Sequence, residues 1–142
     1  MKIKKHASAA WNGGLKDGKG SISTESGALN AYPYGFAARF EGQRGTNPEE
    51  LLGAAHAGCF TMALSLILGE AGFTAERMDT AAEVTLEQVD GGFAITAVSL
   101  ALKAKIPGID SATFQTLAAK AKAGCPLSKV IKADITLIAT LT

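Results

Sequence analysis

The feature that most constrains the fold is the segment from Asn47 to Gly72, which joins a strong helix start to a long apolar run. Asn47 can cap a helix, Pro48 suits its first position, and Glu50 completes a capping-box spacing near the positive helix end. The pattern predicts a helix that runs to about Ala71 and ends at Gly72. Because almost no polar face remains along it, we expect a central, buried helix.

The other segments predict short strands and two further helices. The first 45 residues are rich in glycine, serine and threonine, and "GSIST" and "YGFAARFE" indicate short strands and turns there. Beyond the long helix the expected elements are strands over 80–89, 93–106 and 135–141, a helix over 111–124 and a short helical stretch over 126–132. Paired strands with helices grouped between them favour an α+β class, an antiparallel sheet with the long helix at its centre, over a parallel βαβ sheet.

Length and composition narrow the functional classes. A chain of 142 residues without repeats or low-complexity linkers suits one domain, 1–142. The sequence is 47% hydrophobic and 19% charged with a net charge of +1, which gives no sign of a nucleic-acid or anionic-membrane partner. No apolar block follows "MKIKKH", and the apolar run within 58–68 is too short to span a bilayer. We therefore expect a cytoplasmic protein.

The chain has two cysteines and two histidines. In the cytoplasm such cysteines are typically free, catalytic or redox-cycling rather than a permanent disulfide. Neither a CxxC nor an HExxH spacing occurs, so the sequence predicts no metal site and no cofactor.

Cys59 lies within the apolar helix and has two interpretations. It can be a small packing residue, or a reactive thiol. His56, three residues earlier, shares its helix face, so it can act as a base for Cys59 or be a satisfied core histidine. Burial raises the pKa of a thiol, so a reactive Cys59 needs a cation from outside its helix. Arg39, between apolar neighbours, is a candidate, although a solvent-facing arginine on a strand edge fits equally well.

Cys125 has a different setting, because it precedes Pro126 and can occupy the N-cap of the next helix. Unpaired backbone N–H groups and the helix dipole stabilise a thiolate there, and Lys129 can contribute if it turns inward. The alternative is that "AGCP" is only a junction of small residues between helices. Local electrostatics make Cys125 the more acidic of the two thiols.

Four segments, "TNPEELLGAAHAGCFTMALS", "AKAGCPLSKV", "STESGALN" and "YGFAARFEG", together resemble the OsmC family of osmotically inducible peroxidases, which is related to the organic hydroperoxide resistance proteins. The resemblance covers essentially the whole chain. It implies that Cys59 is the peroxidatic thiol, Cys125 the resolving thiol and Glu49 the acidic site residue. The active-site arginine corresponds to Arg39, and Arg44 is left as the alternative. In the hydroperoxide resistance branch the arginine comes from an earlier loop, so this correspondence is less direct than that of the cysteines.

The resemblance also implies an activity and an assembly. The expected protein is a thiol-dependent peroxidase for organic hydroperoxides that forms a Cys59–Cys125 disulfide, which an external dithiol, commonly a lipoyl group, reduces. The expected assembly is an intertwined homodimer. Glu49 lies roughly 15 Å from Cys59 along a continuous helix, so we expect Glu49 and Arg39 to come from the other subunit. Two alternatives remain: a hydrolase or acyltransferase using Cys59 and His56, and a non-enzymatic dimeric stress protein.

Overall fold

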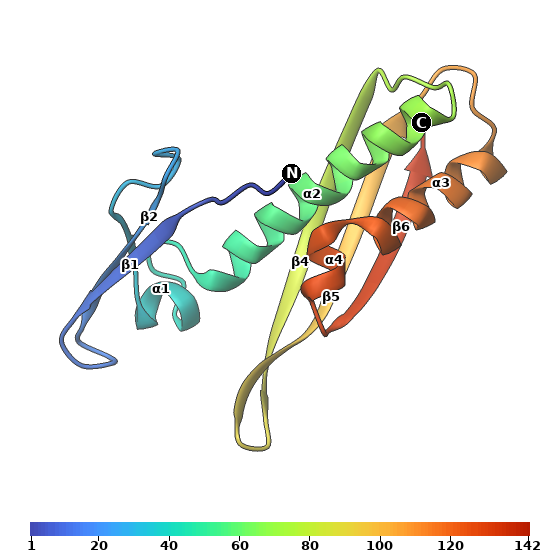
Figure 1. The fold of residues 1–142 in the computed structure, drawn as a ribbon. Helices are drawn as coiled ribbons and strands as arrows, with labels where there is room; N and C mark the ends of the chain where they lie inside the picture. The colour runs from blue at the N-terminus through green and yellow to red at the C-terminus, as the bar shows by residue number, and fades with distance from the viewer. The chain divides into compact units, whose positions relative to one another are not determined.

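The computed structural model describes residues 1–142. In chain order (Figure 1) the elements are β1 (Ala7–Asn12), β2 (Lys19–Thr24), β3 (Tyr32–Tyr34), α1 (Phe36–Phe40), α2 (Pro48–Glu70), β4 (Arg77–Val89), β5 (Gly92–Lys105), α3 (Ser111–Gly124), α4 (Pro126–Val130) and β6 (Asp134–Leu141). Contacts within the chain divide it into two compact units, Met1–Pro48 and Glu49–Thr142.

The first unit is a three-stranded antiparallel sheet, in the order β1-β2-β3, followed by α1. The rings of Trp11 and Tyr34 pack edge to face at 5.5 Å. Gly20 lies against both rings, and a Cβ there would come within 2.5 Å of the Tyr34 ring and 2.6 Å of the Trp11 ring. A side chain at this position would therefore displace the rings of Trp11 and Tyr34.

The prediction of strand or turn over "YGFAARFE" was wrong for Phe36–Phe40, which form α1. Alanine and arginine at its centre favour helix. One helical turn also brings the rings of Phe36 and Phe40 onto the same face, where their centroids lie 5.0 Å apart. Arg39 therefore lies on a helix, and the strand-edge interpretation of this residue was wrong.

The second unit is a three-stranded sheet in the order β4-β5-β6. β4 and β5 form a long antiparallel hairpin, with Gly91 and Gly92 at positive φ in its turn. β5 and β6 pair in parallel, because the crossover through α3 and α4 returns the chain to the end of the sheet at which β5 begins. The α+β class and the long helix are confirmed, but this sheet is mixed rather than wholly antiparallel.

The core of the second unit lies between its helices and one face of this sheet. β5 buries alternate residues, and α2 and α3 each contribute one stripe at helical spacing. The largest fully buried side chains are Phe60, Leu64, Leu68, Val98, Leu100, Leu102, Phe114, His56 and Cys125. Two of these, His56 and Cys125, carry reactive groups.

Helix α2 begins and ends where the sequence predicts, but within one chain it buries only one face. Met62 and Leu66, on its other side, are 76% and 65% exposed. The prediction that the apolar run is too short to span a bilayer was wrong by this measure, because the whole of α2 is long and apolar enough to cross a membrane by length and composition. Core helices of soluble proteins meet the same criterion, and α2 carries a buried stripe that packs on the sheet.

Candidate active site

The two cysteines meet in the second unit, although 66 residues separate them in the sequence. Cys59 lies in the middle of α2 and Cys125 lies at the start of α4, and their Sγ atoms are 2.8 Å apart and hydrogen-bonded. Both thiols are free; Cys125 is fully buried and Cys59 is partly exposed. A disulfide has sulfurs about 2.05 Å apart, so only a small movement separates this contact from a covalent bond.

The backbone fixes Cys125 from both sides. It follows the last residue of α3, and its N–H donates to the carbonyl of Ala121 at 3.0 Å. It is also the N-cap of α4, with Pro126 in the first helical position, and its carbonyl accepts from the N–H of Lys129 at 3.2 Å. The helix junction that the sequence predicts is therefore formed, and it holds the sulfur at the N-terminal end of a helix.

The two thiols differ in acidity. Burial raises the pKa of Cys59, and the hydrogen bond to Cys125 raises it further. Burial also opposes ionisation of Cys125, but hydrogen bonds from Cys59 and from the backbone and hydroxyl of Ser128 outweigh it and lower the pKa of Cys125. The directions of the two pKa shifts agree with the acidity order that local electrostatics predict.

His56 does not pair with Cys59. Its Nε2 lies 2.8 Å from Oγ of Ser128, and its Nδ1 is buried without a hydrogen-bond partner. The ring is fully buried, which lowers its pKa and favours the neutral form. Neither ring nitrogen is hydrogen-bonded to Cys59, so the arrangement gives no support to a Cys-His hydrolase. Sequence reasoning missed Ser128, because its bond to His56 joins residues that are 72 positions apart in the sequence.

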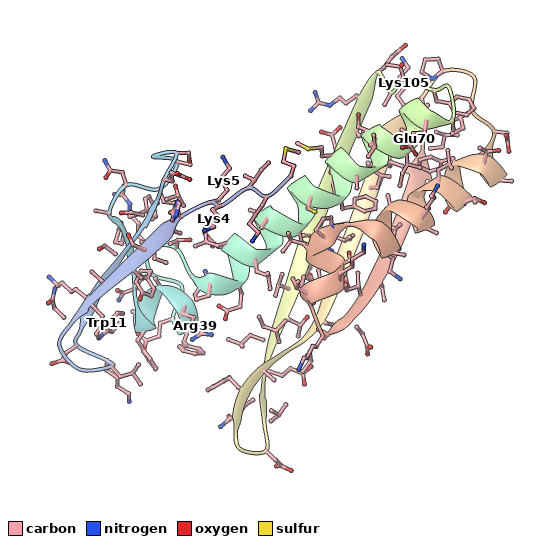
Figure 2. The ribbon with its side chains drawn as sticks, in the orientation of Figure 1. Lys4, Lys5, Trp11, Arg39, Glu70 and Lys105 are labelled. Atoms are coloured by element: carbon pink, nitrogen blue, oxygen red, sulfur yellow. The ribbon has the colours of Figure 1, made fainter.

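The remaining candidates lie in different parts of the chain. Glu49 is in the first turn of α2 and is only 8% exposed. Figure 2 shows Arg39 on α1, where its guanidinium lies 5.3 Å from the ring centroid of Phe40. Arg39 also lines a cavity of about 190 Å³, with Trp11, Leu15, Tyr34, Gly35, Phe36, Phe40 and Pro48. Arg44 lines another cavity of the first unit. The catalytic roles of Arg39, Arg44 and Glu49 stay predictions.

Fold and site together define a class of α+β protein. In this class one free cysteine lies on a long central helix, here α2, and a second lies at the junction of two helices, here α3 and α4, and the two thiols are in contact. The model of the OsmC-like protein family matches residues 40–139. The chain belongs to this family.

Individual relatives agree with this assignment. The chain is 61% identical over 137 residues to peroxiredoxin OsmC of Escherichia coli (strain K12), which covers 96% of each sequence. It is 33% identical over 106 residues to the organic hydroperoxide resistance protein of Xanthomonas axonopodis pv. citri (strain 306), covering 70% of this chain and 69% of the relative. The crystal structure of an organic hydroperoxide resistance protein from Elizabethkingia anophelis is similar with a TM-score of 0.70 and 28% identity, over 100% of this chain and 99% of the other.

Proposed function

We propose that the protein is a thiol-dependent peroxidase that reduces organic hydroperoxides to alcohols, with Cys59 as the peroxidatic and Cys125 as the resolving thiol. The observation that carries the proposal is the 2.8 Å contact between two free cysteine sulfurs. The names of the relatives, a peroxiredoxin and organic hydroperoxide resistance proteins, support the reaction class. The assignment of roles follows exposure, because a substrate can reach the partly exposed Cys59 and not the fully buried Cys125.

The proposed cycle begins with the thiolate of Cys59. Its sulfur attacks the distal peroxide oxygen, the O–O bond breaks, and the alkoxide takes a proton and leaves as an alcohol. The sulfenic acid formed on Cys59 is then attacked by the thiolate of Cys125. The S–S bond forms, the S–O bond breaks, and the hydroxide takes a proton to become water. The two thiols thus supply the two electrons that reduce the peroxide, and an external dithiol, such as a lipoyl group, restores them.

Cys59 needs help to ionise, because its surroundings hold the proton on its sulfur. A guanidinium suits this task, since it keeps its charge and its fixed fork can hold a thiolate and a peroxide oxygen together. We assign this role to Arg39, oriented by Glu49. Arg44 is the alternative.

We also propose that the working protein is a homodimer. The uncovered face of α2, with Met62 and Leu66 exposed, is a large apolar surface for a protein without a partner. A second subunit would cover it and could supply Arg39 and Glu49 to the site around Cys59. The alignment with the Escherichia coli relative runs across both compact units, which favours one domain over 1–142. We expect a cytoplasmic location.

The decisive experiment is to add cumene hydroperoxide to the reduced protein and count free thiols. We expect the loss of two thiols per chain without crosslinking between chains. Cys59→Ser should abolish turnover, whereas Cys125→Ser should permit one oxidation and then stall. Persistence of both thiols would favour a non-enzymatic protein, and hydrolysis of acyl esters without a need for Cys125 would favour a hydrolase.

A further inference from the structure

The Cys59–Cys125 disulfide of the proposed cycle offers two sulfur atoms to an external thiol. A thiolate that attacks one sulfur forms a mixed disulfide there and releases the other cysteine as a thiolate. The two possible products differ, because one carries the mixed disulfide on α2 and the other carries it at the start of α4. The surroundings of the two sulfurs therefore decide the route by which the protein is reduced.

Access to the two sulfurs is unequal and favours Cys59. Cys125 is 0% exposed and belongs to the buried core of the second unit, whereas Cys59 is a partly exposed residue that packs against this core. A thiolate approaches a disulfide from the side opposite the sulfur that leaves, so attack on Cys125 would need an opening into the core. Attack on Cys59 needs no such opening.

The backbone of Cys125 keeps its sulfur in the core. Its N–H donates to the carbonyl of Ala121 at 3.0 Å, and its carbonyl accepts from the N–H of Lys129 at 3.2 Å. Helices on both sides thus hold this residue. Closing the disulfide shortens the distance between the two sulfurs from 2.8 Å to about 2.05 Å. A movement of this size does not bring Cys125 to the surface.

The identity of the leaving group also favours attack on Cys59. In disulfide exchange the thiol with the lower pKa leaves more readily. The pKa of Cys125 is lowered and that of Cys59 is raised. Attack on Cys59 therefore combines the more accessible sulfur with the better leaving group.

We propose that the reducing dithiol attacks the disulfide at Cys59, so that the mixed disulfide forms on α2 and Cys125 leaves as a thiolate. This inference rests on the proposed peroxidase cycle. In the first step the bond between the reductant and Cys59 forms and the Cys59–Cys125 bond breaks. The second thiolate of the reductant then attacks the reductant's own sulfur in the mixed disulfide and releases Cys59 as a thiolate. The dithiol loses two electrons and closes its own disulfide, and its two protons restore the thiols of the protein.

The contact between the two cysteines gives the dithiol an advantage over a monothiol. In the reduced protein the sulfurs are 2.8 Å apart, so the Cys125 thiolate stays close to a mixed disulfide on Cys59. It can attack Cys59 again and expel a bound monothiol, which restores the starting disulfide. A dithiol avoids this reversal, because it closes its own disulfide and leaves. Peroxide and reductant thus react at the same sulfur and need the same approach to it.

The test starts from the intramolecular disulfide made with diamide, so it does not depend on peroxidase activity. The full-length oxidised protein is mixed with excess 2-mercaptoethanol, the reaction is stopped early with acid, and free thiols are labelled with N-ethylmaleimide in urea. Trypsin places the two cysteines on separate peptides, residues 45–77 and 123–129, which mass spectrometry distinguishes. We expect the mercaptoethanol adduct on Cys59 and the maleimide on Cys125 in nearly all singly reacted chains.

The matched control is the same oxidised chain reacted in urea. Neither sulfur is buried there, so the adduct should divide about equally between the two cysteines. Adduct on Cys125 of the folded protein, or an equal division, would overturn the proposal, as would a failure of diamide to join the two cysteines. If the adduct forms on Cys59 but cumene hydroperoxide leaves both thiols free, the peroxidase function fails and the route of reduction stands. If the peroxide consumes both thiols but the adduct forms on Cys125, the function stands and this inference fails.

Discussion

Cys59 and Cys125 are the same residue type, 2.8 Å apart, and yet their pKa values shift in opposite directions. Cys59 lies on the flank of a helix, where the backbone N–H groups are engaged in the helix itself. Cys125 lies at a helix N-terminus, and its pKa is lowered by hydrogen bonding with Cys59 and with the start of α4. The position on the helix, rather than the depth of burial, therefore orders the two thiols.

Arg39 is the residue whose role is tested most directly. Arg39→Ala should move the pH dependence of Cys59 alkylation to higher pH, because the proposed cation that favours its thiolate is removed. The measurement is best made in a Cys125→Ser background, so that only one thiol reacts. Arg77→Ala is the control, since Arg77 is exposed and ion-paired with Asp79 at 2.8 Å. A profile unchanged by Arg39→Ala would move the role to Arg44.

His56 predicts a pH dependence of stability. Burial lowers its pKa, so below about pH 6.5 the unfolded state binds more protons than the folded state. The contribution of His56 to stability is therefore complete above about pH 6.5 and is lost as the pH falls toward the folded-state pKa. Urea unfolding should show this loss in the wild type and less of it in His56→Gln. His6→Gln, at an exposed histidine, is the control; identical profiles for all three proteins would contradict the prediction.

Local sequence patterns predict those site residues whose roles depend on near neighbours in the chain, and they miss a residue whose partner is far away in the sequence. The cysteines and the Cys125 N-cap follow from local spacing and from motifs. Ser128 does not, because its bond to His56 crosses 72 residues, and no local pattern records it.

Some of the secondary-structure elements also follow from local sequence signals, and others do not. The bounds of α2 and the Asp110 cap of α3, which accepts from the N–H of Thr113 at 3.0 Å, follow from local signals. The parallel pairing of β5 with β6 depends on how the crossover packs, which strand patterns do not encode. In α1, a single turn of helix is too short for apolar periodicity to distinguish it from a strand.

Phe114 anchors α3 in the core and provides a prediction at this scale. Its side chain is fully buried, so Phe114→Ala should lower the free energy of unfolding by about 3–5 kcal/mol. Phe114→Leu keeps much of the volume and should cost about 1 kcal/mol. Denaturant unfolding of the reduced proteins measures both, and equal small losses would show that α3 contributes little to the core.

For the whole molecule the first prediction concerns assembly. Leu66→Glu places a charge on the exposed apolar face of α2, where the proposed partner subunit packs, and should convert a dimer into a monomer. Sedimentation equilibrium over a range of concentrations measures the change. Lys120→Glu, on an exposed position of α3, is the control and should remain dimeric. A wild-type protein that sediments as a monomer would contradict the dimer.

The wide separation of the two cysteines along the chain also has a thermodynamic consequence. A bond between residues 66 apart would close a long loop in the unfolded chain and remove much of its conformational entropy. In the loop-closure model this amounts to roughly 4 kcal/mol of added stability. The oxidised protein should therefore melt at a higher temperature than the reduced one. Linkage works in both directions: folding, which holds the two thiols in contact, makes their oxidation to a disulfide more favourable by the same free energy that the disulfide adds to the stability of the fold. The external dithiol that reduces this disulfide must therefore overcome that additional free energy.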